Sequence, residues 1–289
     1  MRELESFLRL QNSEMTKKNY SESINPFLTY FKVNTIEDLL KLTLDDYVDY
    51  RDYLIEEKGN CTNTVNTRFM GISSFLSYLK DELNINIPNY ACSVAKRLVI
   101  QSKKSTSLNV NEAISLLNVC KNPREYAIIM LFLNNGLRIS ELVNLELEDY
   151  DSKNCTISII RKGGIRKTLP ISQEVNGAIS GYLKHRKNGT CTKLFVSNGG
   201  AKMYPYSIDR TIKKLTKRAH IETDISAHSL RRTLATDLHR TGYDIKEIKD
   251  VLGHKSISTT ALYIKDEEEN VRKVVKEHKF VANGGIYAK

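Results

Sequence analysis

The sequence contains no run of about 18 apolar residues, so it predicts no membrane-spanning helix. Its first ten residues, MRELESFLRL, include two glutamates and no small-residue cleavage site, and they do not predict a signal peptide. The five cysteines lie far apart and form no CxxC pair, which argues against a zinc site or a disulfide framework. We expect free thiols in a reducing cytoplasm and no contact with a membrane.

Two common signatures of phosphate chemistry are also missing. The sequence has no P-loop and no cluster of carboxylates with a spacing that suits Mg²⁺. It shows no internal repeat and no low-complexity tract. We therefore expect no cofactor and no metal site.

Positive charge is present in excess and is unevenly distributed. The formal net charge is +10. Residues 1–98 carry 12 Lys and Arg against 14 Asp and Glu, whereas residues 99–265 carry 27 against 15. A polyanion is the expected partner of the central segment, and nucleic acid is the commonest one. The alternative is a set of solvated lysines on an ordinary protein surface.

Helical patterns dominate the first hundred residues. Residues 16–32, 43–59 and 64–83 each carry apolar side chains at helical spacing. Thr43 is a good helix N-cap and Gly59 a good residue to end a helix. We predict four or five short helices in one bundle, in which the tyrosines lie in the core and at its rim or, alternatively, stack on DNA.

The composition changes at residues 99–107, VIQSKKSTS, which are polar and lack periodicity, as in a domain linker. Its Lys103 and Lys104 could also lie along a phosphate backbone. We therefore predict an N-terminal domain over residues 1–98 and a second domain over residues 108–289.

The second domain is expected to mix helices with a small sheet. A buried helix is predicted between Pro123 and Gly136, because its residues are apolar nearly all round. Residues 155–172, CTISIIRKGGIRKTLPIS, alternate and predict a β-hairpin. Its turn presents four cations, Arg161, Lys162, Arg166 and Lys167, and KLFVS at 193–197 predicts a further strand. The remaining patterns predict helices at 172–187, 207–219, 226–241, 244–252, 256–265 and 267–278.

Several polar residues could form one reactive site. Arg138 follows a helix-ending glycine, His228 and Arg231 share a helix face, and His254 lies nine residues before Tyr263. Each motif alone has an ordinary structural explanation, such as a helix cap, a solvated face or a core tyrosine. Together they offer arginines that bind phosphate oxygens, a tyrosine nucleophile and a lysine acid on the hairpin.

The order and spacing of these motifs resemble the tyrosine recombinase family, also called the phage integrase family, in its Xer-like or transposon-resolvase form. The matching stretches lie in residues 3–270: FLRL…MTKKNYSESINPFLTYF, GLRISEL, RKGGIRKTLP, HSLRRTLAT and LGHKSISTTALY. The resemblance implies six catalytic residues: Arg138, Lys162, His228, Arg231, His254 and the nucleophile Tyr263.

The resemblance also implies a fold and an activity. The fold would be mainly α, with a SAM-like helical core-binding domain followed by a mixed α/β catalytic domain of the DNA breaking-rejoining fold. The activity would be metal-free, site-specific recombination of double-stranded DNA through a 3′-phosphotyrosine and a Holliday junction, in a prokaryotic cell and at its nucleoid. The alternatives are relaxation of DNA by a type IB topoisomerase, and a catalytically inert DNA-binding accessory protein.

Some residues are expected to contact DNA or to support the site. A helix over residues 208–220 would place its cations on phosphates or in the major groove, or would simply have a solvated face. Glu141 is expected to support the helix or to orient Arg138, and Arg232 to face away as a backbone contact or surface charge. The DNA-contact set predicted from these patterns is Lys103, Lys104, Arg166, Lys167, Arg210, Lys213, Lys214 and Lys217.

The last segment, residues 266–289, is predicted to form a tail helix with valines on one face. Such a tail could fold back onto its own domain. The resemblance implies instead that it packs into a neighbouring subunit of a tetramer that holds two DNA sites.

Overall fold

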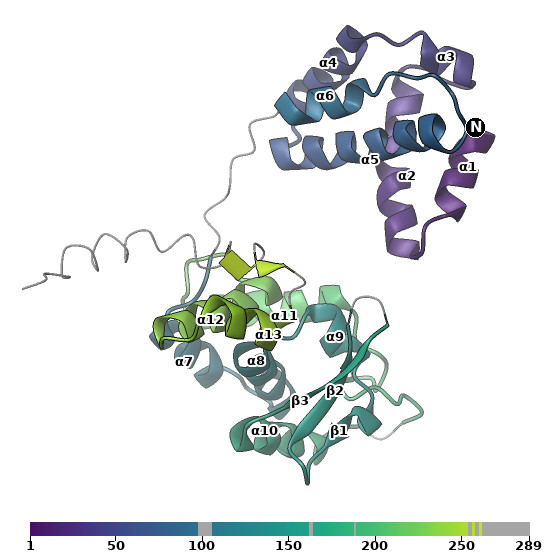
Figure 1. The fold of residues 1–289 in the computed structure, drawn as a ribbon. Helices are drawn as coiled ribbons and strands as arrows, with labels where there is room; N and C mark the ends of the chain where they lie inside the picture. The colour runs from purple at the N-terminus through teal and green to yellow at the C-terminus, as the bar shows by residue number, and fades with distance from the viewer. Residues whose placement is uncertain (98–105, 162–163, 188, 254–255, 258–259, 262–289) are drawn as a thin grey trace, which may run out of the picture. The chain divides into compact units, whose positions relative to one another are not determined.

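The structure is a computed structural model, and it describes residues 1–97, 106–161, 164–187, 189–253, 256–257 and 260–261. The chain forms two compact units, Met1–Lys103 and Lys104–Lys289, which are considered separately (Figure 1). Lys103, Lys104 and most of the predicted linker lie outside the described residues. In the parts of the chain that the structure describes, no helix is long and apolar enough to cross a membrane.

The first unit is entirely helical (Figure 1). We predicted four or five helices, and its described residues form six α-helices and one π-helical turn, η1. These are α1 (Arg2–Arg9), α2 (Glu14–Tyr30), α3 (Ile36–Leu40), α4 (Leu44–Asp52), η1 (Tyr53–Glu57), α5 (Thr62–Asp81) and α6 (Tyr90–Arg97).

Aromatic side chains fill the core of this unit between α2, α4 and α5. Phe27, Tyr47, Tyr50 and Phe69 are all buried, and burial raises the pKa of Tyr47 well above its usual range. The tyrosines of α4 are therefore core residues, as one of the two interpretations had it.

The second unit surrounds one central helix with other helices and a small sheet (Figure 1). Its elements are α7 (Val110–Asn118), α8 (Pro123–Asn135), α9 (Ile139–Asn144), η2 (Leu147–Asp149), β1 (Tyr150–Asp151), β2 (Thr156–Ile160), β3 (Arg166–Pro170), α10 (Gln173–Leu183), α11 (Pro205–Arg218), α12 (Ala227–Arg240) and α13 (Ile245–Leu252).

Helix α8 is the central helix that the sequence predicts. It begins at Pro123, and the side chain of Asn122 caps it by accepting from the Glu125 amide at 2.9 Å. Residues 127–132 are all buried, and α7, α10 and α12 pack around them. The helix ends at Gly136, whose φ of 57° lies in the left-handed region that glycine adopts easily.

The predicted hairpin is confirmed. Strands β2 and β3 pair antiparallel, with Ile160 opposite Arg166, and the short β1 adds a third strand in the order β1-β2-β3. Gly164 has a φ of 77°, and its amide donates to the carbonyl of Arg161 at 3.0 Å. This turn places Arg161 at the end of the sheet where β2 and β3 are joined.

The predicted strand at 193–197 is wrong. Only isolated bridges form there, from Lys193 to Glu146 and from Val196 to Lys202. Leu194, Phe195 and Val196 are buried, so the apolar run reflects packing into the core and not a place in the sheet.

Candidate active site

Arg138 lies in the short connection between α8 and α9. The chain turns at Gly136, and Arg138 becomes the N-cap residue of α9. The buried carboxylate of Glu141 accepts from the Arg138 amide and from its guanidinium, each at 2.7 Å. Glu141 therefore orients this arginine, as expected, while about a third of the Arg138 side chain stays exposed (36%).

Arg231 approaches the same place from α12. Its side chain is buried and donates to the carbonyl oxygens of Gly136 and Leu252. The distance to the Leu252 oxygen is 2.5 Å. One turn earlier, His228 keeps an exposed face. Desolvation of its imidazole by neighbouring protein atoms lowers its pKa, and the positive charges of Arg231, Arg232 and Arg138 lower that pKa further. That shift favours a neutral imidazole near neutral pH.

The C-terminal end of α13 gathers cations from the β2–β3 hairpin, from α12 and from the N-cap of α9. An α-helix leaves its last carbonyl oxygens without partners and carries partial negative charge there. Here four consecutive carbonyls accept from four cationic side chains, and we call this arrangement the α13 terminus. Lys167 reaches Asp250 O at 3.5 Å, Arg161 reaches Val251 O at 3.3 Å, Arg231 reaches Leu252 O at 2.5 Å and Arg138 reaches Gly253 O at 3.3 Å.

A small apolar cluster holds α13 in position. Leu234, Ala235, Ile248 and Leu252 form it between α12 and α13. Gly136 contributes by having no side chain, because a Cβ atom there would lie 2.7 Å from Leu252 Cδ2. The close approach of Gly136 lets α8, α12 and α13 meet at one point.

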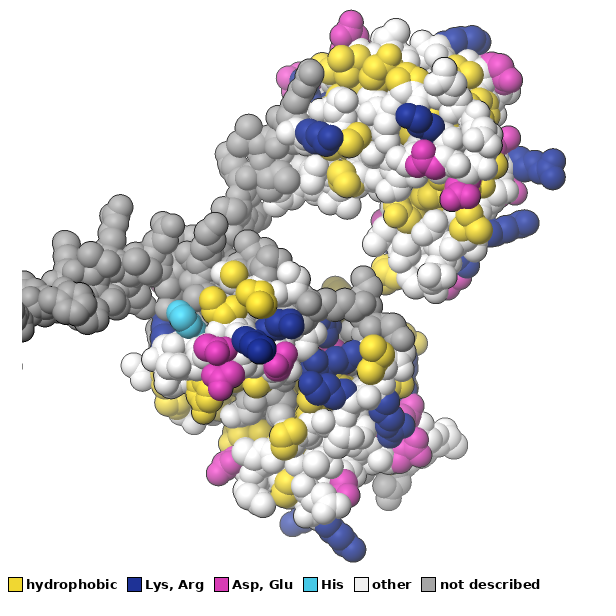
Figure 2. All heavy atoms as spheres, viewed as in Figure 1, with side chains coloured by type: hydrophobic (Ala, Val, Ile, Leu, Met, Phe, Trp, Pro, Cys, Tyr) yellow, Lys and Arg dark blue, Asp and Glu magenta, His cyan; other side chains and the backbone are white. Residues whose placement is uncertain are grey.

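Figure 2 shows that Lys and Arg side chains gather on the face of the second unit that is in view. Of the six predicted catalytic residues, the structure brings together Arg138, His228 and Arg231. Lys162, His254 and Tyr263 lie outside the described residues. Lys162 directly follows Arg161 in the sequence, and His254 directly follows Gly253. Arg161 and Gly253 are both part of the α13 terminus.

Sequence reasoning did not assign a role to Arg161. Its guanidinium lies against the backbone of Gly253, since a Cβ on that glycine would be 1.2 Å from Arg161 Nη1. Burial lowers its pKa, Glu141 opposes that shift and Arg138 adds to it. The only signal in the sequence is its place beside Lys162 in a basic turn.

One expectation about the neighbouring arginine is wrong. Arg232 was expected on the surface, yet it is as buried as Arg231. The reason is that α12 is enclosed nearly all round, with residues 229–236 all buried, so neither of two adjacent positions faces solvent.

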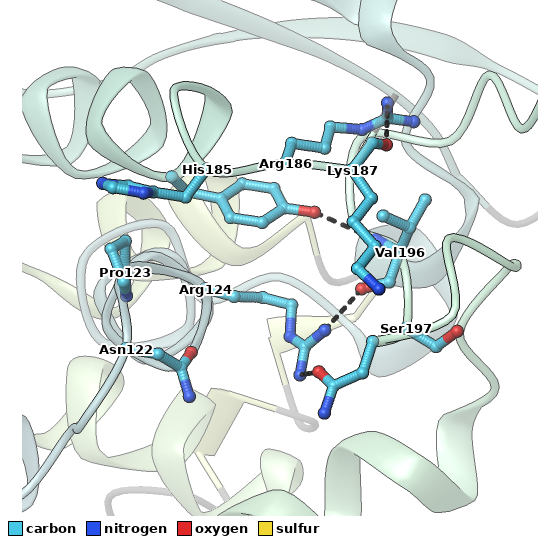
Figure 3. A pocket seen from close by; sticks show the side chains of 10 residues that line it. Asn122, Pro123, Arg124, His185, Arg186, Lys187, Val196 and Ser197 are labelled. Atoms are coloured by element: carbon cyan, nitrogen blue, oxygen red, sulfur yellow. Dashed lines mark hydrogen bonds between the residues drawn. The ribbon is translucent and has the colours of Figure 1, made fainter. Parts of the chain in front are cut away.

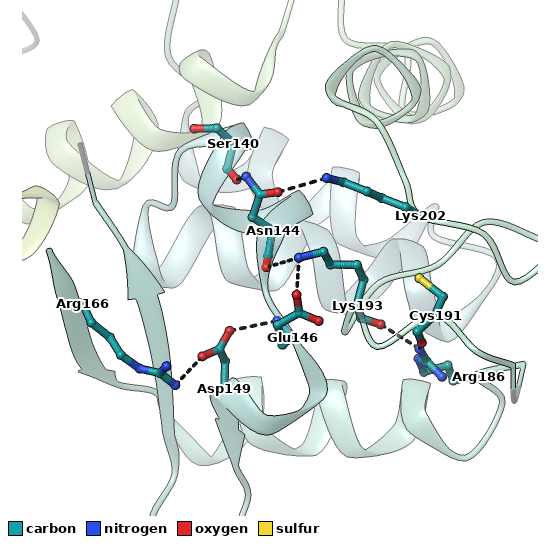
Figure 4. Close-up of polar contacts among 9 residues, drawn as sticks. All are labelled: Ser140, Asn144, Glu146, Asp149, Arg166, Arg186, Cys191, Lys193 and Lys202. Carbon is teal, nitrogen blue, oxygen red and sulfur yellow. Dashed lines mark hydrogen bonds and ion pairs between the residues drawn. The ribbon is translucent and has the colours of Figure 1, made fainter. Parts of the chain in front are cut away.

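The predicted DNA contacts on the hairpin and on α11 differ in their surroundings. Figure 4 shows Arg166 turned toward Asp149, to which it donates at 2.6 Å. On α11, Ile208, Ile212 and Leu215 are buried. The opposite face of that helix carries exposed cations: Arg210, Lys213, Lys214 and Lys217. Lys213 makes only a loose ion pair, 3.9 Å from Asp224.

Another basic hollow lies elsewhere on this unit, beside α8 and α10 (Figure 3). Its arginines already have partners in the backbone. Arg124 donates to Val196 O at 2.8 Å, and Arg186 donates to Cys191 O at 2.6 Å and to Lys193 O at 2.7 Å. These arginines fix loops, and the three catalytic candidates that the structure describes, Arg138, His228 and Arg231, do not line this hollow. Among the described residues, no group of three or more His, Cys, Asp or Glu could hold a metal ion.

Comparison with known proteins gives a consistent result. A sequence model of the phage integrase family matches residues 106–270. The tyrosine recombinase XerC of Caldanaerobacter subterraneus subsp. tengcongensis is 32% identical over 250 residues, which cover 83% of this chain and 70% of that protein. The tyrosine recombinase XerA of Pyrococcus horikoshii is 29% identical over 277 residues, covering 90% of this chain and 95% of the relative.

Solved structures are similar over most of the chain. The crystal structure of XerA recombinase is 25% identical, with a TM-score of 0.56, and the match covers 96% of this chain and 98% of that one. The Tn1549 transposon integrase in complex with transposon right end DNA is 19% identical, with a TM-score of 0.73 and coverage of 92% and 96%. The second of these shares the fold.

Proposed function

The chain belongs to the phage integrase family and is a tyrosine recombinase, and from this premise we propose which residues carry the reaction and on what DNA. The proposed substrate is double-stranded DNA with a specific recombination site, in the cytoplasm and nucleoid of a prokaryotic cell. Residues 1–98 would form the core-binding domain and residues 108–289 the catalytic domain. The observation that carries this proposal is that Arg138 and Arg231 meet at the α13 terminus, where they donate to the carbonyls of Gly253 and Leu252. The residue that follows Gly253 in the sequence is His254.

The first step breaks one strand without loss of bond energy. The Tyr263 oxygen attacks a backbone phosphorus, the P–O5′ bond breaks, and a 3′-phosphotyrosine and a 5′-hydroxyl result. Lys162 gives its proton to the leaving O5′. The neutral imidazole of His228 is in a form that can accept the proton of Tyr263.

The cations act on the phosphate between these two events. Guanidinium groups match two phosphate oxygens at once and are always charged. Arg138, Arg231 and His254 would offset the additional negative charge of the five-coordinate phosphorus. A 5′-hydroxyl from the partner duplex reverses the step, and two rounds of exchange pass through a Holliday junction.

Trapping of the covalent intermediate tests the proposal. A binding site is recovered by selecting duplexes from a random-sequence pool with the full chain. A nick is then placed so that the cut strand diffuses away and the phosphotyrosine persists. A protein–DNA adduct that survives denaturation supports the proposal, whereas binding without any adduct identifies an inert accessory protein. Relaxation of supercoiled plasmid that lacks the site, with no strand exchange, identifies a topoisomerase.

Cleavage should persist in EDTA. Protein cations supply the positive charge that Mg²⁺ supplies in many phosphoryl-transfer enzymes. The yield of trapped adduct on the purified site should be unchanged in excess EDTA, while a Mg²⁺-dependent restriction endonuclease stops on the same DNA. If chelation abolishes the adduct, the cationic cradle alone does not explain the chemistry.

We also propose that residues 266–289 assemble the tetramer. These residues lie outside the described parts of the chain, and the proposal rests on the valine spacing of Val271, Val274 and Val275. Truncation after Lys265 should leave binding to a single site within about twofold and reduce recombination about tenfold or more, because linked subunits raise effective concentration. A truncated chain that recombines normally, or that does not fold, would show that the tail has only a local role.

A further inference from the structure

Arg161 is held through its backbone and through its side chain, although it is not among the six residues that the family resemblance implies. Its amide donates to Ile165 O at 2.9 Å, and its carbonyl accepts from the Gly164 amide at 3.0 Å. Its backbone is therefore part of the hairpin turn, and the next residue along the chain is Lys162.

The Arg161 side chain leaves the sheet and reaches the α13 terminus. Its Nη2 donates to Val251 O at 3.3 Å, and its guanidinium covers Gly253. The buried Nε atom of Arg161 has no hydrogen-bond partner among the described residues. Keeping a charged group half-buried with an unpaired donor has a cost, and Arg138 close by increases it.

The contact between Arg161 and the α13 terminus adds little to the stability of the fold. The other three carbonyls of the α13 terminus have their own donors, and the hydrogen bond from Arg161 Nη2 to Val251 O is long, at 3.3 Å. What Arg161 does provide is geometry, because it joins the turn before Lys162 to the glycine before His254.

The geometry points to Arg161 as a positioning residue that sets where the Lys162 turn stands relative to the α13 terminus during strand cleavage. This inference rests on the proposed function, in which Lys162 protonates the leaving O5′. If Arg161 serves that proton transfer, its loss should matter only when the leaving group needs a proton.

The test uses a leaving group that needs none. A recombination site with sulfur in place of O5′ at the mapped scissile bond releases a thiolate, which is a much weaker base than an alkoxide. Arg161→Met should slow cleavage of the ordinary site about 100-fold, as loss of a general acid does, and leave cleavage of the sulfur site within about threefold of wild type. The cleavage rate of Arg161→Lys on the ordinary site should lie between the rates of wild type and Arg161→Met.

A second variant removes the contact from the other side. In Gly253→Ala, the new Cβ would displace the Arg161 guanidinium, so this variant should show the same dependence on the leaving group. Gly59→Ala is the matched control, since Gly59 has a similar φ of 62° but open space around it. Lys153→Met, which removes an exposed cation at the other end of the sheet, should cleave both sites normally.

The outcomes separate this inference from the proposed function. If the wild-type chain gives no adduct on either site, the proposed function fails. If wild type cleaves and Arg161→Met cleaves the ordinary site equally well, the positioning role alone is overturned. Equal slowing on both sites, or loss of folding in both Arg161 variants, overturns it too, because Arg161 would then act on the phosphate or on the fold.

Discussion

Tyr263→Phe is expected to abolish the covalent adduct while affinity for the recombination site changes by no more than about twofold, because only the attacking oxygen is lost. A gel that resolves bound DNA measures affinity, and a denaturing gel measures the adduct. Removal of the nucleophile leaves no alternative path to the 3′-phosphotyrosine, so the loss should be complete.

Tyr206→Phe is the control for this experiment. Tyr206 is a highly exposed tyrosine of α11 (77% exposed), and the same change there should leave cleavage intact. Recombination that survives in the Tyr263 variant would remove this residue from the mechanism and direct attention to another nucleophile.

Arg231→Met is expected to lower both the rate and the stability. The rate of cleavage should fall about 100- to 1,000-fold, which is the usual cost of removing one donor to a developing anion. The free energy of unfolding should fall by about 3 kcal/mol, because the carbonyls of Gly136 and Leu252 both lose a charged donor in a buried place. Denaturant unfolding and single-turnover cleavage measure the two effects separately.

Arg186→Met separates these two effects. Arg186 also donates to backbone carbonyls, those of Cys191 and Lys193, but it lies in the other hollow (Figure 3). Its replacement should destabilise the unit and leave the cleavage rate unchanged at temperatures where the protein stays folded. A normal cleavage rate in Arg231→Met would place that arginine in the fold alone.

The sequence predicted the elements whose periodicity is strong. Helix α8 is apolar nearly all round and has clear signals at both ends, and the hairpin alternates around a glycine turn, so both were predicted correctly. The segment at 193–197 shows the limit of that reasoning. A short apolar run is the same whether it pairs in a sheet or only packs, and here Leu194 and Phe195 only pack.

The site shows a different limit. Arg138, His228 and Arg231 were predicted because they recur in a recognisable order. Arg161 was not assigned a role, because its partners Val251 and Gly253 lie about ninety residues further along the chain, and no local pattern connects them. Arg232 was misplaced because helical periodicity gives the direction of a side chain only when one side of the helix faces solvent.

Helix α13 looks like a part of the chain that could change in length during evolution. It has eight residues, and only Ile248 and Leu252 are buried. However, one inserted or deleted residue turns the rest of an α-helix by about 100°. Such a change would carry the carbonyls of residues 250–253 away from all four cations at once. We therefore expect insertions and deletions to accumulate in surface loops of this protein and to be absent from α13.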